Sequence, residues 1–166
     1  LHPQPITLAT AADYEGALEK AFVVADPGKR RARLLERLQA VASGSGGTVL
    51  PDEALVDQVV NLVELPNPVL GTFEARHLDL PPEVLIQEMK SHQRYFSIQD
   101  AQGKLLPRFI AVSNTPVKDV ALSVRGYERV LKARLTDGRF FFDEDRRTPL
   151  PERVGRLERR MWVAPL

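Results

Sequence analysis

The apolar residues of this chain change their spacing several times, and this alternation limits the folds open to it. Apolar residues three and four positions apart are typical of amphipathic helices. This helical spacing occupies 10–22, 27–42, 52–64, 83–92 and 120–141, with a weaker example at 151–161. Strand-like patterns occupy four shorter segments, 5–9, 69–73, 95–99 and 105–113. Helices and strands therefore occur in one chain, without an internal repeat.

Two of the strand-like segments predict a β-hairpin at about 95–113. The residues between them, Asp100-Ala101-Gln102-Gly103, have the chemistry of a tight turn. A hairpin requires an antiparallel sheet. The sequence therefore predicts an α+β fold, with several amphipathic helices packed on a small antiparallel sheet that contains this hairpin.

Local signals mark where three of the helices begin. Thr10 with Asp13 resembles a capping box, and Asp26 stands directly before a proline at the first helical position. Asp119 is expected to cap the last long helix. The glycine-rich run 43–47 follows a helix and lacks a following Gly-Lys-Ser/Thr, so it is interpreted as a flexible linker rather than a phosphate-binding loop.

The composition excludes several classes of protein. The chain of 166 residues has no cysteine, so disulfides and thiolate metal sites are excluded, and its three histidines are too far apart for a local metal motif. No segment approaches the roughly 18 apolar residues of a membrane-spanning helix. We therefore expect a cytoplasmic protein without membrane contact. The lack of an initial methionine predicts a piece of a longer chain.

The net charge of +1 conceals an asymmetry between the two halves. Residues 1–88 carry 7 Lys and Arg against 13 Asp and Glu, whereas residues 89–166 carry 16 against 9. A basic half is either an electrostatic footprint for nucleic acid or a solvated surface that complements the acidic half. We expect one compact domain, with an acidic helical part at 1–79 and a basic hairpin-plus-long-helix part at 80–166.

No residues combine into a catalytic nucleophile with its base, so no catalytic residue is assigned. The acidic run at 143–145 offers carboxylate oxygens of the kind Mg²⁺ prefers. Arginines follow directly, however, and we interpret the run as a solvated or ion-paired turn beyond a helix end. No metal site is predicted.

The segment around His92 has two interpretations, one structural and one functional. Leu85, Met89 and His92 share one helix face, so His92 is predicted to point toward the core or a groove wall in a structural role. Lys90 and Arg94 flank it, and two aromatic residues follow. Basic residues interleaved with aromatics suit RNA, although these aromatics also fit a strand core.

The helix at 120–141 carries a basic stripe. Arg125, Arg129 and Lys132 lie at i, i+4 and i+7, with Arg139 two turns further on. The opposing apolar arc comprises Val130, Leu131, Leu135 and Phe141. Arg134 falls in the middle of that arc, where an unpaired guanidinium is costly. Arg134 is therefore predicted to reach a carboxylate or backbone carbonyls of another element.

Three blocks at 80–96, 106–114 and 124–142 carry a family resemblance. They contain the motifs LPPEVLI followed by MKSHQRYF, LPRFIAVSN, and VRGYERVLKARL followed by DGRFFF. These motifs and their spacing resemble the β subunit of bacterial two-subunit glycyl-tRNA synthetase. The resemblance extends over about 5–160 and is strongest along 80–152.

The resemblance implies a non-catalytic portion of a glycine–tRNA ligase, a class II aminoacyl-tRNA synthetase. In that family the α subunit binds glycine and ATP with Mg and makes glycyl-adenylate, and the β subunit supplies tRNA binding. The implied partners are tRNA-Gly, the α subunit and the rest of the β chain, with no cofactor on this segment. The implied RNA-binding candidates are Lys90, Arg94, Arg108, Arg125, Arg129, Lys132 and Arg139.

Two other functions stay open on the sequence alone. Each basic candidate could instead pair with the acidic half, in a structural module that holds the subunits together. Such a module predicts an exposed apolar patch, for which Leu78, Leu80 and the segment 65–73 are candidates. An independent hydrolytic or editing activity has weaker support, with His92 beside Asp79 or Glu88 as its best set.

Overall fold

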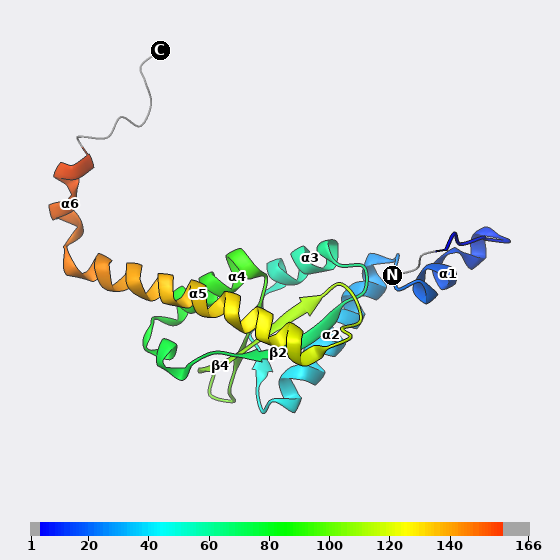
Figure 1. Cartoon of the computed structure of the whole chain (residues 1–166), viewed down its shortest axis with the longest axis horizontal. Helices are drawn as coiled ribbons and strands as arrows, with labels where there is room; N and C mark the ends of the chain where they lie inside the picture. Colours follow the sequence, from blue (N-terminus) through cyan, green and yellow to red (C-terminus); the bar gives the residue numbers. More distant parts are fainter. Residues whose placement is uncertain (1–3, 158–166) are drawn as a thin grey trace, which may run out of the picture.

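The computed structural model describes residues 4–157, and Figure 1 shows their helices and sheet. The described residues form six α-helices, two short 3-10 helices and four strands. In chain order these are η1 (Ala11–Asp13), α1 (Tyr14–Lys20), α2 (Pro27–Gly44), β1 (Thr48–Val49), α3 (Glu53–Leu62), β2 (Asn67–Thr72), η2 (Ala75–Asp79), α4 (Pro82–Gln93), β3 (Phe96–Gln99), β4 (Leu105–Ser113), α5 (Val120–Arg147) and α6 (Leu150–Leu157). The predicted α+β class is confirmed. No helix within residues 4–157 is long and apolar enough to cross a membrane.

The four strands form one antiparallel sheet in the order β1-β3-β4-β2. The hairpin predicted at about 95–113 is confirmed as β3 and β4, and it occupies the centre of the sheet. The outer strands β1 and β2 come from residues 1–79, and the hairpin comes from residues 80–166. Both parts of the chain therefore contribute to the same sheet.

Alternate side chains of the sheet enter two separate cores. Phe96, Ile98 and Ile110 pack with α2 and α3 on one face. Phe109 and Ala111 pack with α4 and α5 on the other. The sheet is thus the middle layer between two pairs of helices, and α5 crosses it on the second face (Figure 1).

Two arginines connect α2 to α3 and to the loop that follows α3. As predicted, Asp26 caps the helix by accepting a backbone N–H of the first turn at 2.9 Å. Further along, Nε of Arg30 donates to the carbonyl of Val60 at 2.7 Å, and the guanidinium of Arg37 donates to the carbonyl of Pro66, also at 2.7 Å. Both guanidiniums are therefore engaged by backbone carbonyls inside the protein.

Two predictions for the first half are wrong. Residues 5–9 form no strand, because nothing in the described sheet pairs with them. The run 43–47 is not a linker: Ser43 and Gly44 are the last residues of α2, and 45–47 form a packed turn. The left-handed conformation of Gly46 (φ 78°) turns the chain, and the N–H of Gly47 donates back to the carbonyl of Ala42 at 3.1 Å. This turn leads directly into β1.

The last long helix continues to Arg147, six residues beyond its predicted end. Residues 143–145 therefore lie inside α5 rather than in a turn. Their carboxylates form ion pairs with Arg139 (2.9 Å, from Asp143), Arg147 and Arg153. Such pairs three and four residues apart support a helix on its exposed face. The helix predicted at 151–161 is α6 as far as Leu157, and 158–161 lies outside the described residues.

Candidate nucleic-acid interface

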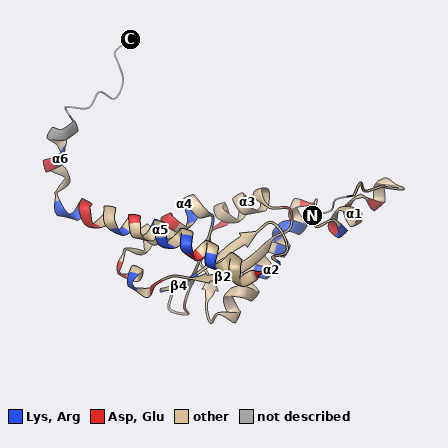
Figure 2. Ribbon diagram, in the orientation of Figure 1, with Lys and Arg blue, Asp and Glu red and all other residues tan. Residues whose placement is uncertain are grey.

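The basic stripe predicted on the last long helix lies on the exposed side of α5. Asp119 caps the helix, as predicted, by accepting the N–H of Leu122 at 2.9 Å. Arg125 and Arg129 are exposed and form no hydrogen bond or ion pair within residues 4–157. Lys132 continues the stripe and pairs with a carboxylate. Figure 2 shows basic residues recurring along α5.

A hollow of about 470 Å³ lies beside this stripe, between α5 and the chain from the end of β2 to η2. We call it the α5–η2 hollow. It is lined by Thr72, Phe73, Glu74, His77, Arg125, Glu128, Arg129 and Lys132. Both carboxylates are held from within: Thr72 donates its N–H and hydroxyl to Glu128 at 2.8 and 2.7 Å, and Lys132 pairs with Glu74 at 2.8 Å. The structure thus brings three of the seven predicted RNA contacts to one hollow.

His77 borders this hollow and was missed by the sequence reasoning. Its side chain is 5% exposed, and its Nε2 is buried without a hydrogen-bond partner. Burial lowers the pKa of His77, and the positive charge of Arg76 lowers it further, so the imidazole is neutral at pH 7. His77 also borders a second hollow of about 340 Å³, lined with Thr136 and Arg139 of α5. No local sequence pattern predicts the burial of His77, because α5, which lines both hollows, is distant in the sequence.

The other four predicted RNA contacts have partners inside the fold. Lys90 pairs with Asp52 at 2.6 Å, and Arg139 pairs with Asp143. Arg94 ends α4 in the left-handed conformation (φ 57°), with its guanidinium on the carbonyl of Ser91. The guanidinium of Arg108 donates to the carbonyl of Ser45 in the turn before β1. Their roles toward RNA stay predictions, and the structure does not bring Lys90, Arg94 and Arg108 into the α5–η2 hollow.

The Lys90–Asp52 pair predicts an effect of pH on stability. Burial raises the pKa of Asp52, but the hydrogen bonds from Lys90 and from the Leu55 N–H outweigh it and leave the pKa below its usual value. The stabilisation is therefore complete above the unfolded pKa near 4 and is lost as pH falls through the folded value. We expect Asp52→Asn to lower the free energy of unfolding by about 1–2 kcal/mol at pH 7.

Urea unfolding between pH 3 and 7 measures this effect. The difference between wild type and Asp52→Asn should shrink as the pH falls below about 4. Asp57→Asn is the matched control, because the Asp57 side chain is 68% exposed in its pair with Arg31 and should contribute little. A difference between wild type and Asp52→Asn that stays constant with pH would contradict the assignment.

The predictions that His92 and Arg134 are buried are both wrong, because other residues of their helices face the core. His92 is exposed: α4 ends one residue later and the chain turns into β3, so nothing covers its last turn on that side. Arg134 is also exposed. The buried arc of α5 centres on Leu131 and Leu135, both 0% exposed, and Arg134 lies at its edge, about 60° from Leu131. It needs no buried partner.

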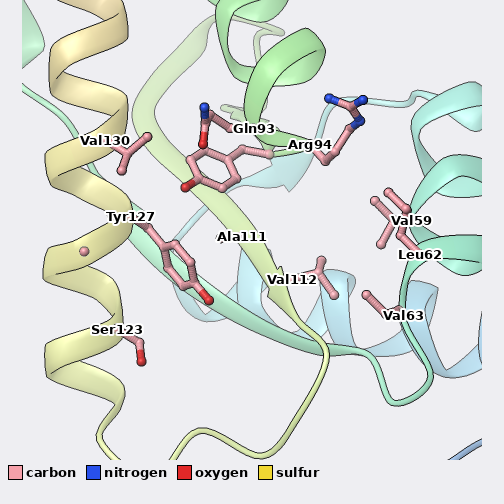
Figure 3. Close-up of a pocket in the computed structure, with 12 residues that line it drawn as sticks. Val59, Leu62, Val63, Gln93, Arg94, Ala111, Val112, Ser123, Tyr127 and Val130 are labelled. Carbon is pink, nitrogen blue, oxygen red and sulfur yellow. The ribbon is translucent and has the colours of Figure 1, made fainter.

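A third, larger hollow of about 650 Å³ opens between α3 and the first half of α5 (Figure 3). Its walls are mainly apolar, with Val59, Val63 and Tyr127 among them. Tyr95, also a lining residue, stacks on Phe109 with ring centroids 4.7 Å apart. Burial, aided by Tyr127, raises the pKa of Tyr95 to about 12, so its phenol stays protonated. The lining residues include no carboxylate or imidazole to activate a nucleophile.

The apolar residues expected on an exposed patch are in the core instead. Leu80 is 2% exposed, Leu78 packs against the second core, and most of 65–73 is buried or half-buried in β2. Exposed apolar surface lies elsewhere, at Phe140 and Phe141 of α5, which are 60% and 63% exposed. Among residues 4–157, no three His, Asp or Glu side chains gather into a group that could hold a metal.

Comparison with known proteins decides the family. A family model described as "Glycyl-tRNA synthetase beta subunit" matches residues 1–166.

The chain belongs to the glycyl-tRNA synthetase β-subunit family.

Relatives named "Glycine--tRNA ligase beta subunit" agree with this assignment. The one from Myxococcus xanthus is 68% identical over 166 residues, which is all of this chain and 24% of that protein. Those from Anaeromyxobacter dehalogenans (strain 2CP-C) and Geobacter sulfurreducens are 53% and 48% identical, over 100% and 93% of this chain. The chain thus spans about a quarter of the length of these β subunits.

Proposed function

We propose that this chain is the part of a glycine–tRNA ligase β subunit that presents α5 to tRNA-Gly and thereby supports aminoacylation in the cytoplasm. In this proposal, glycine activation with ATP and Mg takes place on the α subunit. In the same proposal, the chain itself contributes binding and no catalytic group. Its partners are tRNA-Gly, the α subunit and the remainder of the β chain.

One observation carries the proposal: two exposed guanidiniums that have no partner among residues 4–157 lie four residues apart on α5. Arg125 and Arg129 point to the same side, and Lys132 follows on the next turn. Most other arginines described here are held by carboxylates or backbone carbonyls, as Arg30 and Arg37 are. Guanidiniums donate hydrogen bonds to phosphate oxygens. Two of them one helical turn apart therefore suit the phosphates of a nucleic acid.

Fluorescence anisotropy of labelled tRNA-Gly with the chain, between 50 and 200 mM salt, tests the proposal. Three neutralised phosphates give a slope of about −2.7 in log affinity against log salt, or roughly a fortyfold loss across this range. Absence of binding even at 50 mM salt would reject the proposal.

A structural module remains the second candidate function, and the exposed Phe140–Phe141 pair favours it. The two rings meet edge to face, with centroids 5.5 Å apart, in the second half of α5, a helix that extends beyond the sheet (Figure 1). An aromatic pair in this position suits a protein partner, such as the α subunit. Binding of purified α subunit without binding of tRNA-Gly would establish this second function instead.

A further inference from the structure

The α5–η2 hollow combines positive charge with carboxylates that are already engaged. Three cations and two carboxylates line it, which leaves a net charge of +1. Glu128 accepts both donors of Thr72, and Glu74 is held by Arg76 and Lys132, each at 2.8 Å. Arg125 and Arg129 are the lining cations that these carboxylates leave free. A ligand of this hollow is therefore an anion that two guanidiniums can share, such as a phosphodiester.

The same hollow also has an aromatic ring and a buried polar atom without a partner. Phe73 is half-buried, packs against the second core and also lines the hollow, and His77 lines it too, with its Nε2 unbonded among the described residues. Buried nitrogens of this kind are nearly always hydrogen-bonded in folded proteins. A neutral imidazole offers a hydrogen bond without charge, which suits the edge of a nucleobase, and an aromatic face suits base stacking.

Size and accessibility point to a nucleotide outside a duplex. A volume of about 470 Å³ lies within the usual range of small-ligand sites, and a single nucleotide is a ligand of that class. A base inside a helix is stacked on both faces and paired at its edge, so it cannot reach a ring and an imidazole in a hollow.

We infer that the α5–η2 hollow binds one unpaired nucleotide of the RNA, with its phosphate on Arg125 and Arg129 and its base against Phe73 and His77. This inference rests on the proposed function, because it specifies which part of the RNA meets the hollow. It adds a site for a single-stranded residue beside the general attraction of α5 for phosphates.

Two labelled RNA hairpins with the same stem test the inference, one blunt and one with a 3′ tail of four unpaired nucleotides. The wild-type chain should bind the tailed hairpin roughly tenfold more tightly, as expected for one stacked base. Phe73→Leu retains apolar bulk but removes the aromatic face, so the ratio of the two affinities should fall to about one. Phe140→Leu, an exposed aromatic elsewhere on α5, is the matched control and should retain the advantage.

A measurement on the wild-type chain covers the possibility that Phe73→Leu does not fold. The imidazole resonance of His77, one of three histidines, should shift with the tailed hairpin and not with the blunt one. Equal binding of both hairpins, a tail advantage that survives Phe73→Leu, or an unmoved His77 resonance would overturn the inference and leave the proposed function standing. Failure of both hairpins to bind would also overturn the inference, whereas the proposed function is rejected separately, by absence of tRNA-Gly binding at 50 mM salt.

Discussion

Replacing Arg125, Arg129 and Lys132 together by alanine is expected to lower the affinity of the chain for tRNA-Gly by roughly a hundredfold at low salt. The three side chains lie on one exposed face of α5, and two of them have no internal partner among the described residues. Each phosphate that they neutralise releases counterions, so the slope of log affinity against log salt should flatten by about 2.7. The anisotropy titration of tRNA-Gly measures both quantities.

A second triple variant tests whether the loss of affinity depends on where the cations lie or only on the net charge of the chain. Lys104, Lys118 and Arg134 are exposed cations away from the α5–η2 hollow, and their replacement by alanine removes the same charge. This control should lose less than about fivefold in affinity, since it alters only the long-range field. Equal losses in the two variants would show that the stripe has no specific role.

The largest effect on stability is expected from a substitution at Gly71. A Cβ built on Gly71 would lie 2.3 Å from Cζ of Phe109 and 2.6 Å from its Cε1. The Phe109 ring is fully buried and stacked on Tyr95, so it cannot swing aside freely. We expect Gly71→Ala to lower the free energy of unfolding by about 2–3 kcal/mol, as overpacking does in other cores. Urea denaturation measures it as a lower midpoint at unchanged slope.

Two further variants test whether the contact between residues 71 and 109 causes this loss of stability. Gly126→Ala changes a helical glycine with open space around it, and it should stabilise the chain by about 0.5–1 kcal/mol. Combining Gly71→Ala with Phe109→Leu should be less destabilising than the sum of the two single changes, because the smaller side chain makes room for the methyl group. Additive losses would indicate that the two residues do not share this contact.

Three features of the fold that depend on local chemistry were predicted correctly. The turn at 100–103 identified the hairpin, and aspartates at 26 and 119 identified two helix starts. These signals act over three or four residues, so they survive in almost any tertiary setting. The segment 5–9 failed because its pattern resembles a strand, whereas a strand also needs a pairing partner.

The candidate site was predicted only in part, for a physical reason. Helical spacing alone placed Arg125, Arg129 and Lys132 on one face of a helix. The hollow beside them requires the chain from the end of β2 to η2 to lie beside α5, and the Thr72–Glu128 hydrogen bond between these parts spans 56 residues. The buried histidine is therefore His77 rather than His92, because tertiary contacts select which of the two is covered.

The strand order has a consequence for synthesis of the chain. Because β1 and β2 are the two outer strands and never pair with each other, the sheet has no pairing partner for either strand before the central hairpin exists. On a ribosome that emits the chain from its N-terminus, β1 and β2 emerge with their hydrogen-bonding edges open, and the sheet closes only after residue 113 has left the exit tunnel. A pause in translation before that residue would leave α2 and α3 with their apolar faces uncovered, as a target for chaperones.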